Sequence, residues 1–256
     1  MRHIDKPRET LPCLEEWADA QVAGRAEHDG RWEPLPLSYP SFGRTPELKR
    51  ELIAEQFGLC AYTGTGIDAE GLKRRSPKEQ NPPRFDHWFT AHIEHLKPQS
   101  VCRRELEQAG GVYGRDRGED TSYRNMVAAM LVNGNPEQQF GAAIRGDRPL
   151  AVLPTSPDCD AAFFFFEDGA VFGATGPGTA AVSTLLLDHG SLRDWRMEAI
   201  DFHLPLREMT QPDELRRLIV EMKTPVNGRL PDFCFVISSL AHQYLGMQED
   251  LATTPS

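Results

Sequence analysis

The sequence is short of cysteine and has no long hydrophobic run, and each shortage excludes a class of protein. Its five cysteines are scattered, and none has a partner at metal-finger spacing: Cys13, Cys60, Cys102, Cys159 and Cys234. This pattern predicts reduced, mostly buried thiols. Mean hydropathy is −0.48, and no apolar run approaches about 18 residues, so we expect no membrane span. The polar N-terminus leads into no apolar core, which argues against a signal peptide and predicts a cytoplasmic protein.

Positive charge is also scarce, because 28 Lys and Arg face 38 Asp and Glu, for a net charge of −10. Proteins that bind nucleic acid unaided usually have basic surfaces, since phosphate contacts dominate their affinity. Basic residues do cluster before and after residues 92–98: Lys73, Arg74, Arg75, Lys78 and Arg84, then Arg103, Arg104, Arg115, Arg117 and Arg124. Each group is either a solvated charged loop or a phosphate-binding surface.

The length of 256 residues and the 39% hydrophobic content predict a substantial core in one or two domains. Apolar periodicity predicts helices over 11–22, 45–57, 179–187, 212–222 and 231–245. Extended chain is expected over 88–96, and a β-hairpin with an Asp168-Gly169 turn over 162–173. We expect loops over 24–43 and 97–121, a surface insertion over 68–84, and helical or mixed structure over 123–132. The fold class predicted is α+β.

The residues with the clearest chemical meaning lie between His92 and Pro98. Glu94 directly precedes His95 at the end of the extended run, and Pro98 ends that run. Some 30 residues later come Tyr123-Arg124-Asn125-Met126, and then two further asparagines, Asn133 and Asn135. An acid-His pair followed by Asn and a final Asn is the pattern of a ββα-metal (HNH) nuclease site.

Phosphodiester hydrolysis explains why these residue types are needed together. A histidine with a pKa near neutrality takes a proton from water, and we assign this general-base role to His95. Mg²⁺ or Mn²⁺ prefers oxygen ligands, which indicates Glu94 with Asn133, and Asn135 as the reserve. Asn125 would orient His95 or tie the loop down. Neighbouring strand residues face opposite ways, so Glu94 and His95 share a site only where the strand ends or bends.

Three short motifs give the chain its resemblance to a known family: Cys60-Ala61-Tyr62, Ile93-Glu94-His95-Leu96-Lys97-Pro98 and Tyr123-Arg124-Asn125-Met126. The chain resembles the HNH endonucleases of retron-associated and Septu-type antiphage systems, over most of its length. The resemblance implies metal-dependent cleavage of DNA or RNA. It also implies an ABC/SMC-like ATPase as partner, together with a retron reverse transcriptase and its noncoding RNA.

The chain departs from this family at two Cys-x-x-Cys knuckles that usually bind a structural zinc. The first reads Cys60-Ala61-Tyr62-Thr63 and the second Met130-Leu131-Val132-Asn133. One cysteine is too few for a tetrahedral zinc site, so we predict no structural zinc and apolar packing by Met130 and Val132. Counting back from Phe140-Gly141 favours Asn133 as the last metal ligand, whereas counting forward from Asn125 gives Gly134.

These inferences predict an HNH module over 57–145, embedded in a mostly helical protein. Residues 1–56 form an N-terminal helical and loop segment, and residues 146–256 a hairpin and helices that pack on the module. Candidate nucleic-acid-binding residues are Lys97, Arg74, Arg75, Arg124 and His92. A rival hypothesis is a catalytically degenerate HNH scaffold that only bridges partner proteins. The run Phe163–Phe166 predicts a strand with at most half of its rings on one face, for core packing in preference to base stacking.

Overall fold

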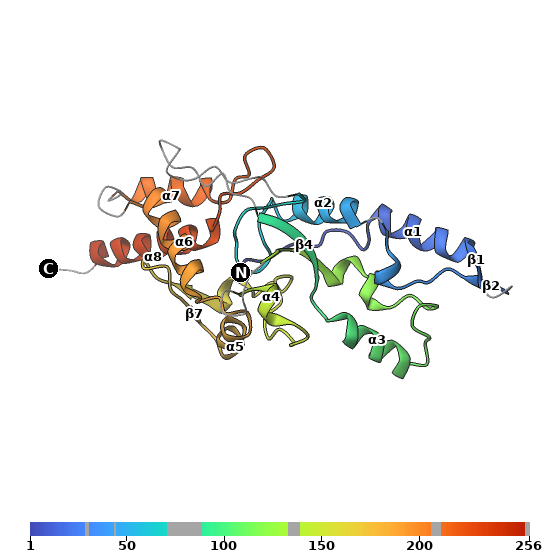
Figure 1. Cartoon of the computed structure of the whole chain (residues 1–256). Helices are drawn as coiled ribbons and strands as arrows, with labels where there is room; N and C mark the ends of the chain where they lie inside the picture. The colour runs from blue at the N-terminus through green and yellow to red at the C-terminus, as the bar shows by residue number, and fades with distance from the viewer. Residues whose placement is uncertain (29–30, 44, 71–88, 133–138, 206–210, 254–256) are drawn as a thin grey trace.

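The structure is a computed structural model that describes residues 1–28, 31–43, 45–70, 89–132, 139–205 and 211–253 (Figure 1). It has both helices and strands, so the predicted α+β class is confirmed. The N-terminal half contains α1 (Pro12–Ala23), β1 (Arg25–His28), β2 (Arg31–Pro34), α2 (Thr45–Glu55), β3 (Ile67–Asp68), β4 (Phe89–His95), α3 (Gln99–Gln108), β5 (Met126–Met130) and α4 (Ala142–Arg145). The C-terminal half contains β6 (Phe163–Phe165), β7 (Val171–Gly173), α5 (Gly176–Leu185), α6 (Gly190–His203), α7 (Pro212–Glu221) and α8 (Cys234–Thr253).

The central sheet has the order β3-β4-β5, with β3 parallel and β5 antiparallel to β4. Its register pairs Glu94 with Val127 and His95 with Met126. Helix α2 packs against β4 and β5, where the Gln56 side chain donates to the Ala128 carbonyl and accepts from the Ala128 N–H. The sheet therefore fixes the backbone on which the predicted catalytic pair stands.

Helix α2 shows why its sequence folds as expected and where it deviates. Pro46 suits the first turn because its missing N–H is not needed there, and Leu48 and Leu52 are fully buried. Phe57 was expected on the same apolar stripe, but it is 36% exposed. The chain turns left-handed at Phe57 (φ 54°) and Gly58 (φ 74°), which ends the helix and swings the ring outward. Likewise Val22 of α1 is exposed, not buried.

Three other expectations were wrong. Residues 24–43 contain the antiparallel β1–β2 pair and a short 3-10 turn (Tyr39–Ser41) in place of a continuous loop. Residues 97–121 contain helix α3 and a second 3-10 turn (Glu119–Thr121). Residues 123–132 form a 3-10 turn (Tyr123–Asn125) and then strand β5, not a helix. The hairpin over 162–173 and its Asp-Gly turn are confirmed, with Gly169 at φ 75°. The insertion over 68–84 lies almost entirely outside the described residues.

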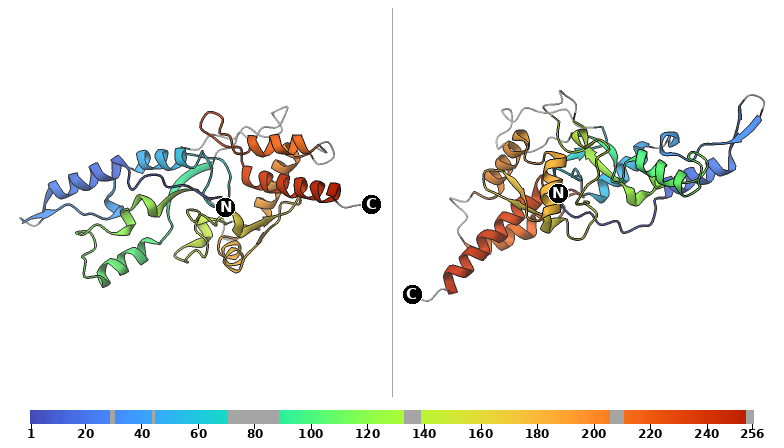
Figure 2. Two further views of the ribbon diagram at one scale, coloured as in Figure 1. Left: turned by 180° about the vertical axis from the view of Figure 1, so that it is seen from behind. Right: turned by 90° about the horizontal axis from the view of Figure 1, so that it is seen from below.

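The views in Figures 1 and 2 place α1, β1, β2 and α3 at one end of the molecule and α5 to α8 at the other, with β4 between them. One hydrophobic core nonetheless connects both ends, from Ile4 near the N-terminus through the central sheet to Ala241 in α8. No helix in the part of the chain that is described is long and apolar enough to cross a membrane.

Candidate functional site

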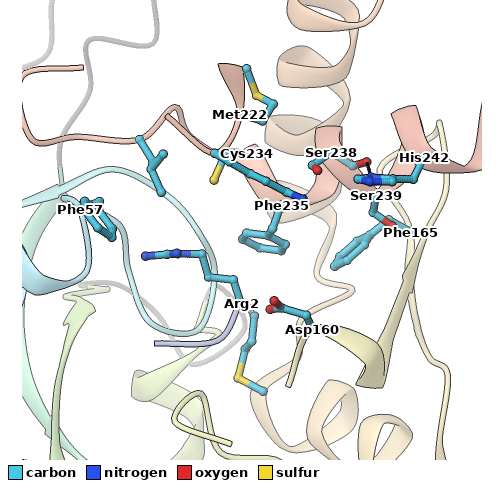
Figure 3. Close-up of a pocket in the computed structure, with 13 residues that line it drawn as sticks. Arg2, Phe57, Asp160, Phe165, Met222, Cys234, Phe235, Ser238, Ser239 and His242 are labelled. Atoms are coloured by element: carbon cyan, nitrogen blue, oxygen red, sulfur yellow. Dashed lines mark hydrogen bonds between the residues drawn. The ribbon is translucent and has the colours of Figure 1, made fainter. Parts of the chain in front are cut away.

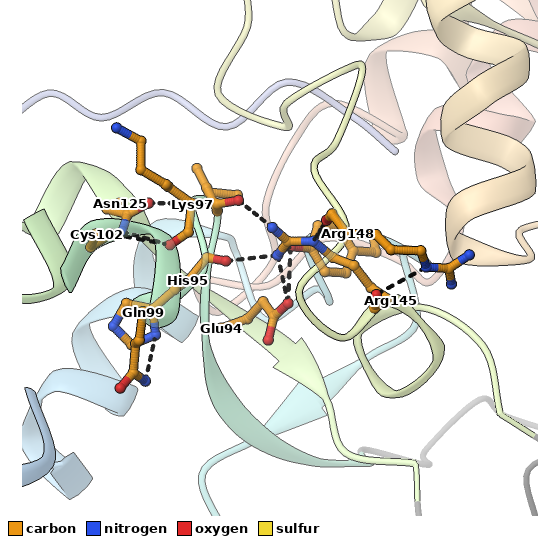
Figure 4. Close-up of polar contacts among 10 residues, drawn as sticks. Glu94, His95, Lys97, Gln99, Cys102, Asn125, Arg145 and Arg148 are labelled. Atoms are coloured by element: carbon orange, nitrogen blue, oxygen red, sulfur yellow. Dashed lines mark hydrogen bonds and ion pairs between the residues drawn. The ribbon is translucent and has the colours of Figure 1, made fainter. Parts of the chain in front are cut away.

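Glu94 and His95 stand at the end of β4, but their side chains make separate sets of contacts (Figure 4). Oε1 of Glu94 accepts from Arg145 at 2.7 Å and lies 3.5 Å from the Tyr62 hydroxyl. The His95 ring instead contacts Gln99 and the Asp120 carbonyl. The strand remains regular through His95, so the alternation of side chains persists and the structure does not bring the two residues into one pocket.

The contacts of the His95 ring define its tautomer. Nε2 lies 2.9 Å from the backbone oxygen of Asp120, and because a carbonyl only accepts, Nε2 carries the proton. Nδ1 is then the lone-pair nitrogen of the neutral ring, and it accepts from the Gln99 side-chain amide at 3.3 Å. The edge of the Tyr39 ring packs on the imidazole with centroids 4.4 Å apart. Burial lowers the pKa of His95, and the hydrogen bond to Asp120 opposes that shift in part.

Asp120 holds its own carbonyl in place through its carboxylate. Oδ2 accepts from the Tyr39 N–H at 2.9 Å and from the Tyr113 hydroxyl at 3.4 Å. The residue is 1% exposed. Tyr39 thus both anchors Asp120 and packs against His95, so the imidazole is positioned by two residues that the sequence did not single out.

Asn125 ties down the chain that follows β4. Its Oδ1 accepts from the Lys97 N–H at 2.6 Å, and its Nδ2 donates to the carbonyls of Lys97 (3.1 Å) and Glu119 (3.2 Å). The side chain is buried. Among the hydrogen bonds of the described residues, none joins Asn125 to His95. Of the two roles predicted for it, the geometry gives Asn125 that of closing the loop.

Arg145 is the largest fully buried side chain in the described part of the molecule, and it grips the end of β4. Its Nη1 donates to Glu94, to the Tyr62 hydroxyl (3.1 Å) and to the His95 carbonyl (2.7 Å). Its Nη2 donates to the Leu96 carbonyl, and its Nε to the Arg148 carbonyl. Burial raises the pKa of Glu94, and the guanidinium opposes that shift.

The predicted metal ligands do not form a site as they are placed. Asn133 and Asn135 lie outside the described residues. Glu94 already has the Arg145 guanidinium as its cation. Within the ranges that the structure describes, no group of three His, Cys, Asp or Glu side chains is arranged to hold a metal ion.

The predicted nucleic-acid-binding residues are largely engaged with carboxylates. Lys97 pairs with Glu105 (2.9 Å) and Glu119 (2.5 Å), and these contacts raise its pKa. Arg124 pairs with Glu9 at 2.5 Å. His92 is half-buried on β4, and burial lowers its pKa. Arg74 and Arg75 lie outside the described residues.

The positions that correspond to the two zinc knuckles meet in the core. The Met130 N–H donates to the Cys60 thiol at 3.2 Å, and the Thr65 hydroxyl contacts the Met130 sulfur at 3.3 Å. Thr63 and Thr65 share a hydrogen bond of 2.8 Å. Met130 is buried and Val132 packs against the core, which confirms their predicted packing. All five cysteines are free and buried, as expected from their scatter.

A cavity of about 320 Å³ lies elsewhere, between the N-terminal residues, α7 and α8 (Figure 3). Phe165 and Phe235 line it together with the polar groups of Arg2, Asp160 and His242. His242 is committed through Nδ1 to the Ser238 carbonyl at 2.7 Å. None of the site residues predicted from the sequence lines this cavity, so it does not bear on the HNH hypothesis.

Comparison with known proteins adds no identification. A scan against protein-family models finds no match for the chain. A search of curated proteins also finds no match. The resemblance to HNH nucleases therefore depends on the quoted motifs themselves.

Proposed function

We propose that this protein is an HNH-type endonuclease, a phosphodiester hydrolase in which His95 is the general base. The observation that carries the proposal is the tautomer of His95. The Asp120 carbonyl holds the proton on Nε2, which leaves Nδ1 as the basic nitrogen, blocked only by the half-buried Gln99 amide. A fixed neutral imidazole with one outward lone pair is what proton abstraction from water requires.

The reaction assigned to His95 is limited to proton transfer. Once Gln99 turns away, a water molecule takes its place and gives a proton to Nδ1 as its oxygen attacks phosphorus. The new O–P bond forms while the bond to the 3′ oxygen breaks. That oxygen takes a proton from solvent, and the imidazolium later returns its own proton to solvent, so the enzyme is unchanged.

The cofactor implied by the resemblance is Mg²⁺ or Mn²⁺ at Glu94 with Asn133 or Asn135. The described residues do not fit this ion as arranged, because Arg145 already neutralises the Glu94 carboxylate. No catalytic step is therefore assigned to the metal. Structural zinc forms no part of the proposal, since Thr63 and Met130 stand where two of its sulfur ligands would be needed.

The wider assignment depends on the resemblance alone. Strands β4 and β5, followed by α4, would form the ββα unit of an HNH module. Nucleic acid would be the substrate, with an ABC/SMC-like ATPase, a retron reverse transcriptase and its noncoding RNA as partners in antiphage defence. The ion pairs of Lys97 and Arg124 support a nuclease whose partner supplies much of the hold on nucleic acid.

The second candidate is a degenerate HNH scaffold that bridges partner proteins without cleaving anything. The Arg145–Glu94 pair is the observation that favours it, because a guanidinium fills the place of the catalytic cation. The two candidates differ in one respect that is simple to measure, namely whether His95 is needed for cleavage.

The deciding experiment compares wild type, His95→Ala and a control, His242→Ala, for cleavage of single- and double-stranded DNA and RNA. Each is assayed alone and with the ATPase partner, in Mg²⁺, Mn²⁺ or EDTA. His242 is an exposed histidine in α8 that the proposal leaves outside the site. We expect cleavage by wild type and His242→Ala, and a loss of at least about a hundredfold in His95→Ala. Equal activity in all three, or none in any condition, supports the scaffold.

A further inference from the structure

The hairpin formed by β6 and β7 exposes three phenylalanines side by side. Phe164, Phe166 and Phe172 are 41%, 44% and 57% exposed. Phe163 and Phe165, which alternate with them on β6, are buried. One face of the hairpin thus belongs to the core, and the other presents aromatic rings to solvent.

The three rings form one continuous surface. Phe164 and Phe172 are direct partners in the register of the two strands. Phe166 contacts both, with ring centroids 5.0 Å from Phe164 and 5.3 Å from Phe172. Single exposed apolar side chains are ordinary on protein surfaces, whereas contiguous aromatic patches mark binding sites.

The sequence around this surface contains no basic residue. From Pro149 to Leu192 there is no Lys or Arg, although the segment includes five acids: Asp158, Asp160, Glu167, Asp168 and Asp188. Glu167 and Asp168 lie in the turn of the hairpin itself. The aromatic surface is therefore set in a segment with only negative formal charge.

This charge pattern selects the kind of ligand that fits. A platform for single-stranded nucleic acid combines stacking rings with basic residues along the backbone path, and this segment has none. The faces of aromatic rings attract cations, as carboxylates do. The complementary surface is therefore basic and apolar together, as on an amphipathic helix with Arg or Lys beside Leu.

We propose that Phe164, Phe166 and Phe172 form a docking surface for a basic, apolar segment of a partner protein. The hairpin is held against the helical end of the molecule, since β6 packs on α8 and β7 on α5 (Figure 1). Such support keeps the rings in place before a partner arrives, which limits the entropy lost on binding. The surface is separate from His95, and the proposal is independent of nuclease activity.

The test uses the full chain and a synthetic 20-residue helical peptide of Leu and Arg as the probe. Its binding is measured by fluorescence anisotropy for wild type, the triple variant F164S/F166S/F172S and the control Val226→Ser. Val226 is 69% exposed outside the hairpin. All three proteins have the same net charge, so nonspecific attraction to an acidic protein is constant. We expect the triple variant to bind at least about tenfold more weakly and the control to bind as wild type.

Several results would overturn the proposal. They are equal binding by the triple variant, no binding by wild type, or equal binding of a matched peptide with Glu in place of Arg. Loss of binding to a 20-nucleotide oligo(dT) in the variant would indicate a base-stacking platform instead. A dimer of the wild type that the variant abolishes would indicate a second copy of this chain. Should the triple variant fail to fold, Phe172→Ser alone, at the most exposed ring, gives the same comparison.

Discussion

Arg145 and Glu94, which are 51 residues apart in the sequence, meet at 2.7 Å in the interior of the protein. The guanidinium side chain is 1% exposed and the carboxylate side chain 16% exposed. A charge this deeply buried depends on its counter-ion, because the cost of removing it from water is otherwise not offset. Glu94 therefore has a structural duty that is distinct from any role in catalysis.

We predict that Glu94→Ala lowers the free energy of unfolding by about 3–5 kcal/mol, because it leaves Arg145 buried without its carboxylate. Glu94→Gln keeps an acceptor for Nη1, so its loss is smaller. Urea denaturation followed by circular dichroism measures both. The control is Glu107→Ala, which breaks the exposed pair with Arg103 in α3 and costs less than about 1 kcal/mol. Equal stability of Glu94→Ala and Glu107→Ala would show that the pair has no such weight.

Asn125 gives a second prediction, which depends on its two donated hydrogen bonds. In Asn125→Asp, Oδ1 still accepts from Lys97, but the carbonyls of Lys97 and Glu119 lose their donor. We expect a loss of about 2–4 kcal/mol in the free energy of unfolding, since two buried acceptors are left unpaired. The matched control is Asn227→Asp, at an exposed turn with φ 52° that both residue types tolerate. If the two variants are equally stable in thermal unfolding, Asn125 does not close the loop.

The sequence predicted the strand that presents His95, and its limits elsewhere have physical reasons. Strand β5 was expected as helical or mixed structure because all five of its residues are buried, which removes the alternation that identifies a strand. Helix α3 was taken for loop because only Cys102 is buried in it, so it has almost no apolar stripe. The glycines at 110, 111, 114 and 118, which follow it, reinforced the loop interpretation.

The site shows the same division between local pattern and tertiary contact. Asn125 was predicted with the role of closing the loop as one of two options, because its motif lies close to the strand. Arg145 and Asp120 gave no local signal of their contacts. Arg145 reaches Glu94 only because β4 and α4 are adjacent in space. Asp120 contacts His95 through its backbone carbonyl, which every residue type possesses.

The pH dependence of stability is predicted from Asp232. Burial raises its pKa to about 7, opposed by the Gly66 N–H and Arg229. A carboxyl whose pKa is higher in the folded state contributes stability that is complete below its unfolded value near 3.9. That contribution is lost as the pH rises from about 4 to about 7, roughly 1–3 kcal/mol in total.

Asp232→Asn is expected to remove this slope and to be more stable than wild type at pH 8. The amide oxygen can still accept from Gly66, so the hydrogen bond of 2.9 Å is preserved. Thermal unfolding of both proteins between pH 4 and pH 8 measures the difference. Asp201→Asn, an exposed position in α6, should keep the wild-type slope. A slope that survives in Asp232→Asn would assign the pH dependence to other groups.

Lys6 and Glu55 form a second buried ion pair, which joins the N-terminal segment to α2. Nζ lies 2.6 Å from Oε1, and the two side chains are 6% and 13% exposed. Lys6 also sits over the Tyr123 ring, 4.2 Å from its centroid. Burial lowers the pKa of Lys6 and raises that of Glu55, so desolvation outweighs attraction for both groups. Breaking the pair and replacing it should therefore have opposite consequences.

We predict that Lys6→Met alone lowers the free energy of unfolding by about 3–5 kcal/mol, because Glu55 stays buried without a cation. The double variant K6M/E55L should recover most of this loss, since two apolar side chains fill the same space without a desolvation penalty. The neighbouring Arg8–Glu51 pair links the same two elements at 3.3 Å but is 57% and 52% exposed. Its coupling energy in a double-mutant cycle should be below about 1 kcal/mol. A double variant no more stable than Lys6→Met would mean that the ion pair itself, and not relief from desolvation, holds the N-terminal segment on α2.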